Sequence, residues 1–112
     1  MNDDAFWGLV AGRRSVRRYA PDPVSAETVE KLLAAAHWAP SAHNRQPWRF
    51  VLLNEAATRR RLAEAMAARW HADLLADGGD PAAIARRAAL SRQRIAGAPL
   101  AILPCLDLDA LD

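Results

Sequence analysis

The chain has 112 residues, of which 52% are hydrophobic and 25% are charged, and its formal net charge at pH 7 is +2. This length suits one domain with a modest core, and the composition excludes an intrinsically disordered chain. No segment has the apolar length of a membrane span or the pattern of a secretory signal, and the single cysteine, Cys105, allows no internal disulfide, so we expect a cytoplasmic protein.

A short helix is predicted near the amino terminus, and an arginine-rich loop follows it at once. Phe6, Trp7 and Val10 have helical spacing, and Gly12 is expected to end the helix. The loop Arg13–Tyr19 reads Arg-Arg-Ser-Val-Arg-Arg-Tyr. It offers charged donors, a hydroxyl and backbone N–H groups to a phosphate. A solvated basic loop, a nucleic-acid-binding patch or a targeting patch has the same composition, so these alternatives stay open.

An amphipathic helix is predicted next, with Ser25 as its N-cap and an end near His37, before Pro40. Four apolar residues follow the i, i+3, i+4, i+7 pattern of such a helix: Val29, Leu32, Leu33 and Ala36.

The segment after this helix has the composition of a binding loop. Residues 39–46 read Ala-Pro-Ser-Ala-His-Asn-Arg-Gln and supply a hydroxyl, amides, an imidazole and loop backbone groups. Such groups can read the polar edge of a flat ring. A plain turn, in which Asn44 bonds its own backbone, accounts for the same residues. The apolar run Trp48–Leu53 then predicts a strand.

A long helix is predicted after this strand, with Asn54 as its cap and Arg59–Arg61 on its solvated face. Residues spaced by four predict its buried stripe: Leu62, Met66, Trp70 and Leu74. The four tryptophans, Trp7, Trp38, Trp48 and Trp70, are expected to pack in a core or an interface.

Asp80 and Pro81 favour the start of another helix, which is expected to end near Gly97. Its thin apolar face consists of Ile84, Ala88 and Ile95. Leu100–Leu106 predicts a second strand, in which Pro104 indicates an edge position or a bulge and Cys105 is expected to be a small buried residue.

The order of these motifs resembles the FMN-dependent nitroreductase family. The resemblance rests on R-R-S-V-R-x-[YF], then a helix, then A-P-S-x-x-N-x-Q-P-W-R-F leading into a strand. It implies an α+β fold with helices packed on a mostly antiparallel sheet. It also implies a single domain over residues 1–112 that stops short of the family's carboxy-terminal half, and a homodimer with shared flavin sites.

The resemblance further implies two groups of cofactor-binding residues. The group expected to hold the FMN phosphate and ribityl chain is Arg13, Arg14, Ser15 and Arg17. The group expected to line the flavin ring, in the partner subunit's site, is Pro40, Ser41, Ala42, Asn44 and Gln46. No protein acid or base is obligatory, so no catalytic side chain is predicted. No metal site is predicted either, because His37, His43 and His71 have no second ligand at zinc spacing.

The activity implied is ping-pong electron transfer from NAD(P)H through FMN to a nitroaromatic, a quinone or a similar small molecule. One alternative is reduction of a deazaflavin intermediate in coenzyme F420 biosynthesis, because Leu62–Leu106 resembles the nitroreductase-like domain of the F420 γ-glutamyl ligase. Another is a non-catalytic fragment that only dimerises. A nucleic-acid-binding module is disfavoured, because 13 acidic residues balance the basic ones and no known nucleic-acid motif occurs. No membrane partner is expected.

Overall fold

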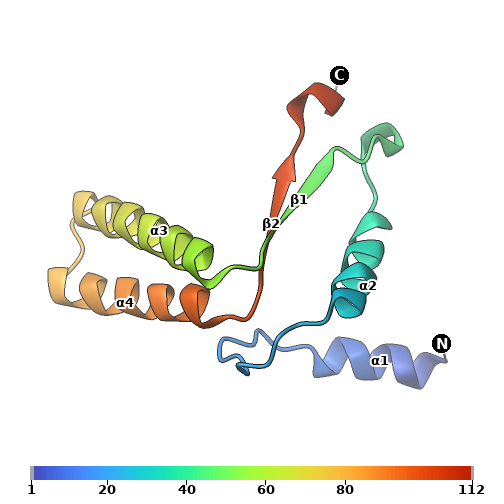
Figure 1. Ribbon diagram of the computed structural model, residues 1–112, viewed down its shortest axis with the longest axis horizontal. Helices are drawn as coiled ribbons and strands as arrows, with labels where there is room; N and C mark the ends of the chain where they lie inside the picture. The colour runs from blue at the N-terminus through green and yellow to red at the C-terminus, as the bar shows by residue number, and fades with distance from the viewer. Residues whose placement is uncertain (1, 112) are drawn as a thin grey trace.

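A computed structural model describes residues 2–111 as helices and a small sheet (Figure 1). The elements are α1 (Asp3–Gly12), α2 (Ala26–His37), the 3-10 helix η1 (Ala42–Asn44), β1 (Trp48–Leu53), α3 (Ala56–Ala76), α4 (Pro81–Gly97), β2 (Ala101–Leu106) and the 3-10 helix η2 (Leu108–Leu111). Four α-helices and an antiparallel pair of strands confirm the predicted α+β class.

Side-chain caps fix the beginnings of three helices. Asn2 accepts from the N–H of Ala5 at 2.8 Å, so α1 starts at Asp3, earlier than its apolar spacing indicates. The predicted caps Ser25 and Asp80 are confirmed, because each accepts a hydrogen bond from the backbone N–H three residues later.

The prediction that Asn54 caps α3 is wrong. The N-cap position is Glu55, whose side chain makes no capping hydrogen bond. Asn54 instead contributes its backbone carbonyl, which accepts from Nη1 of Arg59 at 2.6 Å.

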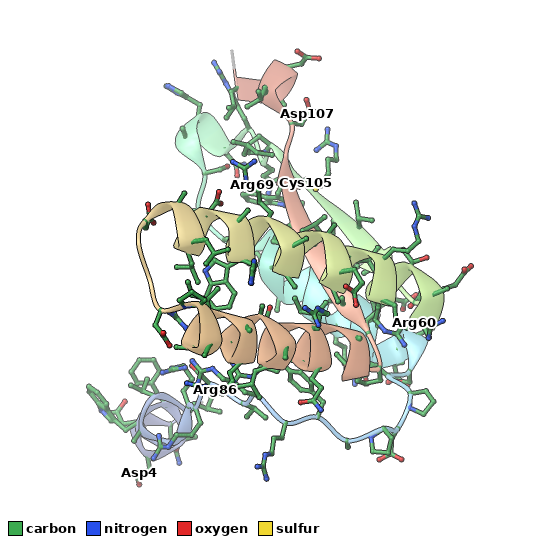
Figure 2. The ribbon with its side chains drawn as sticks, turned by 90° about the vertical axis from the view of Figure 1, so that its left-hand side faces the viewer. Asp4, Arg60, Arg69, Arg86, Cys105 and Asp107 are labelled. Atoms are coloured by element: carbon green, nitrogen blue, oxygen red, sulfur yellow. The ribbon has the colours of Figure 1, made fainter. Side chains whose placement is uncertain are left out.

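The strands β1 and β2 pair antiparallel in an unbroken register. Trp48 lies opposite Leu106, and Leu53 lies opposite Ala101. Pro104 lies opposite Phe50 without a bulge, and both strands of a two-stranded sheet are edge strands, which confirms the edge position predicted for Pro104. Cys105 is exposed on β2 (Figure 2), so its predicted burial is wrong: among residues 2–111 the sheet has two strands, and they leave this side chain uncovered.

The best-buried residues lie between α3 and α4, which form an antiparallel helical hairpin (Figure 1). Ala63 and Ala67 of α3 are 1% and 0% exposed, and Ile84 and Ala88 of α4 are 3% and 1% exposed. Small side chains at the contact allow the two helix axes to approach closely.

The predicted buried stripe of α3 is therefore displaced by one residue. Met66 is 47% exposed, and Leu62, Trp70 and Leu74 are only half-buried. The larger side chains flank the alanine contact, because the line of closest approach has room only for Ala63 and Ala67. On α4, the predicted face is confirmed at Ile84 and Ala88, and Ile95 is half-buried.

Arg59 corrects a second expectation about α3. It is 8% exposed, and its Nη1 donates to the carbonyls of Leu53 and Asn54 at 3.1 and 2.6 Å. Arg60 and Arg61 are exposed, as expected. The first of the three arginines thus joins the end of β1 to the first turn of α3.

The amino-terminal helices lie apart from the α3–α4 hairpin, and Figure 2 shows α1 below α4. Several large apolar side chains of α1 are more than half exposed: Phe6, Trp7, Leu9 and Val10. Trp38, at the end of α2, is 85% exposed. Of the predicted core or interface, the core is therefore wrong for Trp7 and Trp38, and an interface stays a prediction for them, while Trp48 and Trp70 are half-buried.

Candidate functional site

The arginine-rich loop leaves α1 at Arg13, which is the C-cap of that helix. The side chain of Arg14 is bound to the end of α1, because its Nη1 donates to the carbonyls of Ala11 and Arg13 at 2.7 and 2.8 Å. Arg17 has one weak contact, with the carbonyl of Ser15 at 3.5 Å. Among residues 2–111, Arg13 and Arg17 form no ion pair. Their guanidinium groups are therefore free to bind an external anion.

The loop before β1 has an unusual backbone. His43, Asn44 and Gln46 have φ values of 53°, 51° and 50°, in the left-handed region that residues with a side chain seldom adopt. Such conformations cost on the order of 1 kcal/mol each and persist only where surrounding contacts impose them. They are concentrated at functional sites more often than elsewhere.

Ser41 holds this loop in place. Its Oγ accepts the N–H of Gln46 at 3.0 Å, and its carbonyl accepts the N–H of Asn44 at 3.0 Å. The side chain of Asn44 is exposed and makes no hydrogen bond with any described residue, which contradicts the plain-turn alternative in which it bonds its own backbone. The amide is therefore available to an external ligand.

Gln46 also lies beside a pocket of about 580 Å³ between α2 and β1. Its Nε2 donates to the carbonyl of His37 at 3.5 Å, and the His37 ring meets Trp48 edge to face at 6.3 Å. Arg45 lines the same pocket and donates to the carbonyl of Leu111 in η2. No local pattern singles out Arg45, because its partner lies 66 positions further along the chain.

The two predicted groups of site residues lie at opposite ends of α2 (Figure 1). A helix of 12 residues is about 18 Å long. Within each group the residues are close together, but one chain does not bring Arg13, Ser15 and Arg17 next to Ser41 and Asn44.

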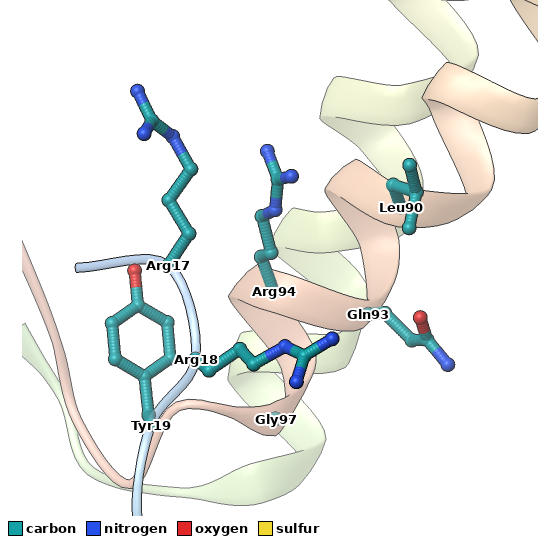
Figure 3. Close-up of a pocket in the computed structure, with 7 residues that line it drawn as sticks. All are labelled: Arg17, Arg18, Tyr19, Leu90, Gln93, Arg94 and Gly97. Atoms are coloured by element: carbon teal, nitrogen blue, oxygen red, sulfur yellow. The ribbon is translucent and has the colours of Figure 1, made fainter. Parts of the chain in front are cut away.

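The arginine-rich loop has a further neighbour that sequence reasoning missed. Arg17, Arg18 and Tyr19 line a pocket of about 440 Å³ together with residues of α4 (Figure 3). The α4 residues are Leu90, Gln93, Arg94 and Gly97. Arg94 lies more than seventy positions beyond the loop in an ordinary amphipathic helix, so no local pattern connects the two.

Both groups fit a flavin nucleotide by their chemistry. Guanidinium groups without carboxylate partners suit a phosphate, and a loop with free amide and backbone groups suits the polar edge of a ring. In the described part of the chain, no cluster of three or more His, Cys, Asp or Glu side chains could hold a metal ion. No helix among residues 2–111 combines the length and the apolar character needed to cross a bilayer.

Comparison with known proteins gives one family and several partial relatives. Residues 10–110 match the nitroreductase family. A protein named NADH dehydrogenase from Thermus thermophilus is 48% identical over 61 residues, which are 54% of this chain and 30% of the relative. A 5,6-dimethylbenzimidazole synthase from Rhodospirillum rubrum is 48% identical over 56 residues, which are 50% of this chain and 26% of the relative.

A third relative, a putative NADH dehydrogenase/NAD(P)H nitroreductase from Archaeoglobus fulgidus, is 40% identical over 57 residues. The match covers 51% of this chain and 33% of that protein. The aligned part of the chain thus spans about a quarter to a third of the length of each of these relatives.

Proposed function

The chain belongs to the nitroreductase family, and from that premise we propose that it functions in an FMN-dependent oxidoreductase that takes electrons from NAD(P)H. The membership confirms the family resemblance drawn from the motifs. The electron acceptor in this proposal is a small molecule such as a nitroaromatic or a quinone. The observation that carries the proposal is the pair of unsatisfied polar loops that flank α2.

The first loop is proposed to bind the phosphate end of the cofactor. Arg13 and Arg17 are exposed and lack carboxylate partners, and the hydroxyl of Ser15 makes no hydrogen bond with another described residue. A dianionic phosphate would receive charge-assisted hydrogen bonds from these groups. Arg14 acts differently, because its guanidinium closes α1 and so positions the loop.

The second loop is proposed to contact the flavin ring. The left-handed residues His43, Asn44 and Gln46 leave the loop's polar groups exposed on a backbone that Ser41 fixes. Pro40 and Ala42 belong to the same segment and would give the ring an apolar contact. When bound, FMN supplies the redox chemistry, and the protein's part is to bind it, orient it and adjust its electronics.

A homodimer is proposed to combine the two loops. Since the loops of one chain lie at opposite ends of α2, a second copy offers a way to bring Arg17 of one chain near Asn44 of the other. The exposed apolar residues of α1 and the exposed Trp38 provide surface for such an association.

The names of the relatives support a nicotinamide electron donor and do not identify the electron acceptor. Two of them are named for NADH or NAD(P)H, which supports a nicotinamide electron donor for this chain. The third is named for the synthesis of 5,6-dimethylbenzimidazole, so substrates differ among similar proteins. Reduction of a deazaflavin intermediate remains the alternative reaction, and a dimerising fragment without catalysis is the alternative outside enzymes.

An absorbance spectrum of the purified chain tests the proposal, with the released cofactor identified by mass. We expect visible flavin bands and FMN, and we expect Arg13→Ala and Asn44→Ala to lose the cofactor while Arg60→Ala, on an exposed position of α3, keeps it. NAD(P)H oxidation with a nitroaromatic acceptor would then identify the general reductase. Deazaflavin binding without that turnover would identify the alternative reaction, and a stable oligomer that takes up no added FMN would overturn the proposal.

A further inference from the structure

The pocket between the arginine-rich loop and α4 has an uncompensated positive charge. Three of its seven lining residues are arginines, namely Arg17, Arg18 and Arg94, and none is a carboxylate. In Figure 3 the side chains of Arg17 and Arg94 extend in the same direction, and the guanidinium of Arg18 lies on the Gln93 side. Guanidinium groups remain protonated at all physiological pH values, so this charge is permanent.

Among the described residues, three arginines outside the pocket pair with acids. Arg92 pairs with Glu64 at 3.4 Å across the helical hairpin, and Arg69 pairs with Asp73 at 3.2 Å on α3. Arg18 and Arg94, like the exposed Arg60 and Arg61, form no hydrogen bond or ion pair with any residue of the described range; they differ from those two in lining one pocket together with Arg17. Like charges gathered around one pocket repel each other, and a bound anion would remove that repulsion.

The remaining lining groups suit a phosphate ester. The hydroxyl of Tyr19 and the amide of Gln93 add neutral hydrogen-bonding groups to the three guanidiniums. Arg18, Tyr19 and Arg94 also border a neighbouring groove of about 600 Å³, whose other walls are mostly apolar. An anionic group in the pocket could therefore carry an apolar or aromatic part that rests in the groove.

We infer that Arg18 and Arg94, with Arg17, Tyr19 and Gln93, form a phosphate-binding pocket, and that α4 contributes to nucleotide recognition through Arg94. Because Arg17 also belongs to the loop proposed to bind the cofactor phosphate, the inference rests on the proposed function at that residue, while its test with inorganic phosphate needs no bound flavin. The phosphate can come from a flavin mononucleotide, from a phosphorylated dinucleotide, or from free phosphate. All three sources present the same dianionic oxygens.

Calorimetric titration of the chain with inorganic phosphate and with pyrophosphate tests the pocket. We expect Arg94→Gln to weaken binding at least about tenfold, because one bidentate charge-assisted contact is lost. Arg60→Gln is the matched control: it removes the same charge from an exposed position on α3 that lines none of the described pockets. Circular dichroism of both variants verifies that they fold, and Arg94→Lys, which keeps the charge, should recover part of the affinity.

Paired ligands then identify the source of the phosphate. A loss in Arg94→Gln that affects FMN and spares riboflavin assigns the pocket to the flavin phosphate. A loss that affects NADP⁺ and spares NAD⁺ assigns it to the dinucleotide, and a loss confined to inorganic phosphate assigns it to the free ion. Equal phosphate affinity in the unchanged chain and in folded Arg94→Gln, or no phosphate binding by either, overturns the inference. Neither result depends on whether flavin binds, so the proposed function is judged separately.

Discussion

At the scale of single residues, Ser41 has the most consequential contacts of the loop before β1. Its hydroxyl accepts the N–H of Gln46, and its carbonyl accepts the N–H of Asn44. Both partners hold left-handed backbone angles, so the serine stabilises a conformation that their own side chains disfavour.

Ser41→Ala should lower the free energy of unfolding by about 1 kcal/mol, because the N–H of Gln46 loses its partner. Urea denaturation measures this change. Ser15→Ala is the control, since the hydroxyl of Ser15 makes no bond with another described residue and its removal should leave stability within about 0.5 kcal/mol. Equal losses in the two variants would contradict the role given to Ser41.

Individual roles at the candidate site were only partly predictable. The motif predicted one common role for Arg13, Arg14 and Arg17. The sequence alone does not show that Arg14 bonds to the end of α1 while the other two have no ion pair with a described residue. Arg94 was missed for a different reason. Its proximity to the loop is created by tertiary packing, which leaves no trace in local spacing.

At the scale of elements, a buried arginine joins a strand to a helix. Arg59 is 8% exposed, and it donates to two carbonyls at the end of β1 and the residue after it. Its Nε is buried without a partner in the described part of the chain, so Nη1 makes the side-chain hydrogen bonds found for Arg59 there.

Arg59→Met should lower the free energy of unfolding by about 2 kcal/mol, because the carbonyls of Leu53 and Asn54 lose a charged donor. Arg60→Met, at the neighbouring exposed position, should change it by less than about 0.5 kcal/mol. Chemical denaturation of both variants provides the comparison. A neutral effect of Arg59→Met would show that methionine packing replaces the lost bonds.

The contact between α3 and α4 depends on small side chains. Ala67→Leu should lower the free energy of unfolding by about 1–3 kcal/mol, because the added atoms force apart two closely packed helices at a fully buried position. Ala68→Leu, one residue further along and exposed, should have little effect. Thermal unfolding distinguishes the two, and similar melting temperatures would show that the hairpin has room to adjust.

Local sequence signals predicted where helices and strands begin better than they predicted which side chains are buried. The strand Trp48–Leu53 and the caps Ser25 and Asp80 follow from residue types in neighbouring positions, and the structure confirms them. The buried stripe of α3 was predicted one residue away from its observed position. The prediction followed the large apolar residues spaced by four, whereas the close contact with α4 is made by the small residues Ala63 and Ala67. Arg59 was misread for a similar reason, since its partners belong to a different element.

At the scale of the whole molecule, apolar surface is distributed unevenly. The hairpin buries Ala63, Ala67 and Ala88 almost completely, whereas α1 exposes more than half of Phe6, Trp7, Leu9 and Val10. Exposed apolar surface of this kind is typical of a protein interface. The extents of the chain, 48 × 38 × 29 Å, agree with an open arrangement that leaves such surface uncovered.

We expect the chain to self-associate through this surface. Sedimentation velocity should show a dimer at micromolar concentration, and Trp7→Glu should shift the distribution toward monomer because it places a charge on an apolar contact. Glu30→Gln, an exposed change on α2, is the control and should leave the distribution unchanged. A monomer at all concentrations would contradict the proposed homodimer.

The pairing of β1 with β2 also constrains the order in which the chain folds. Residues 54–100 lie between the two strands, and they form the α3–α4 hairpin. Closing a loop of that length from a disordered chain carries a substantial entropic cost, whereas a preformed helical hairpin brings the loop's ends close together. The sheet next to the candidate site should therefore form after the hairpin, so assembly of that site should depend on the turn at Gly78 and Gly79, at the end of the hairpin away from the sheet (Figure 1).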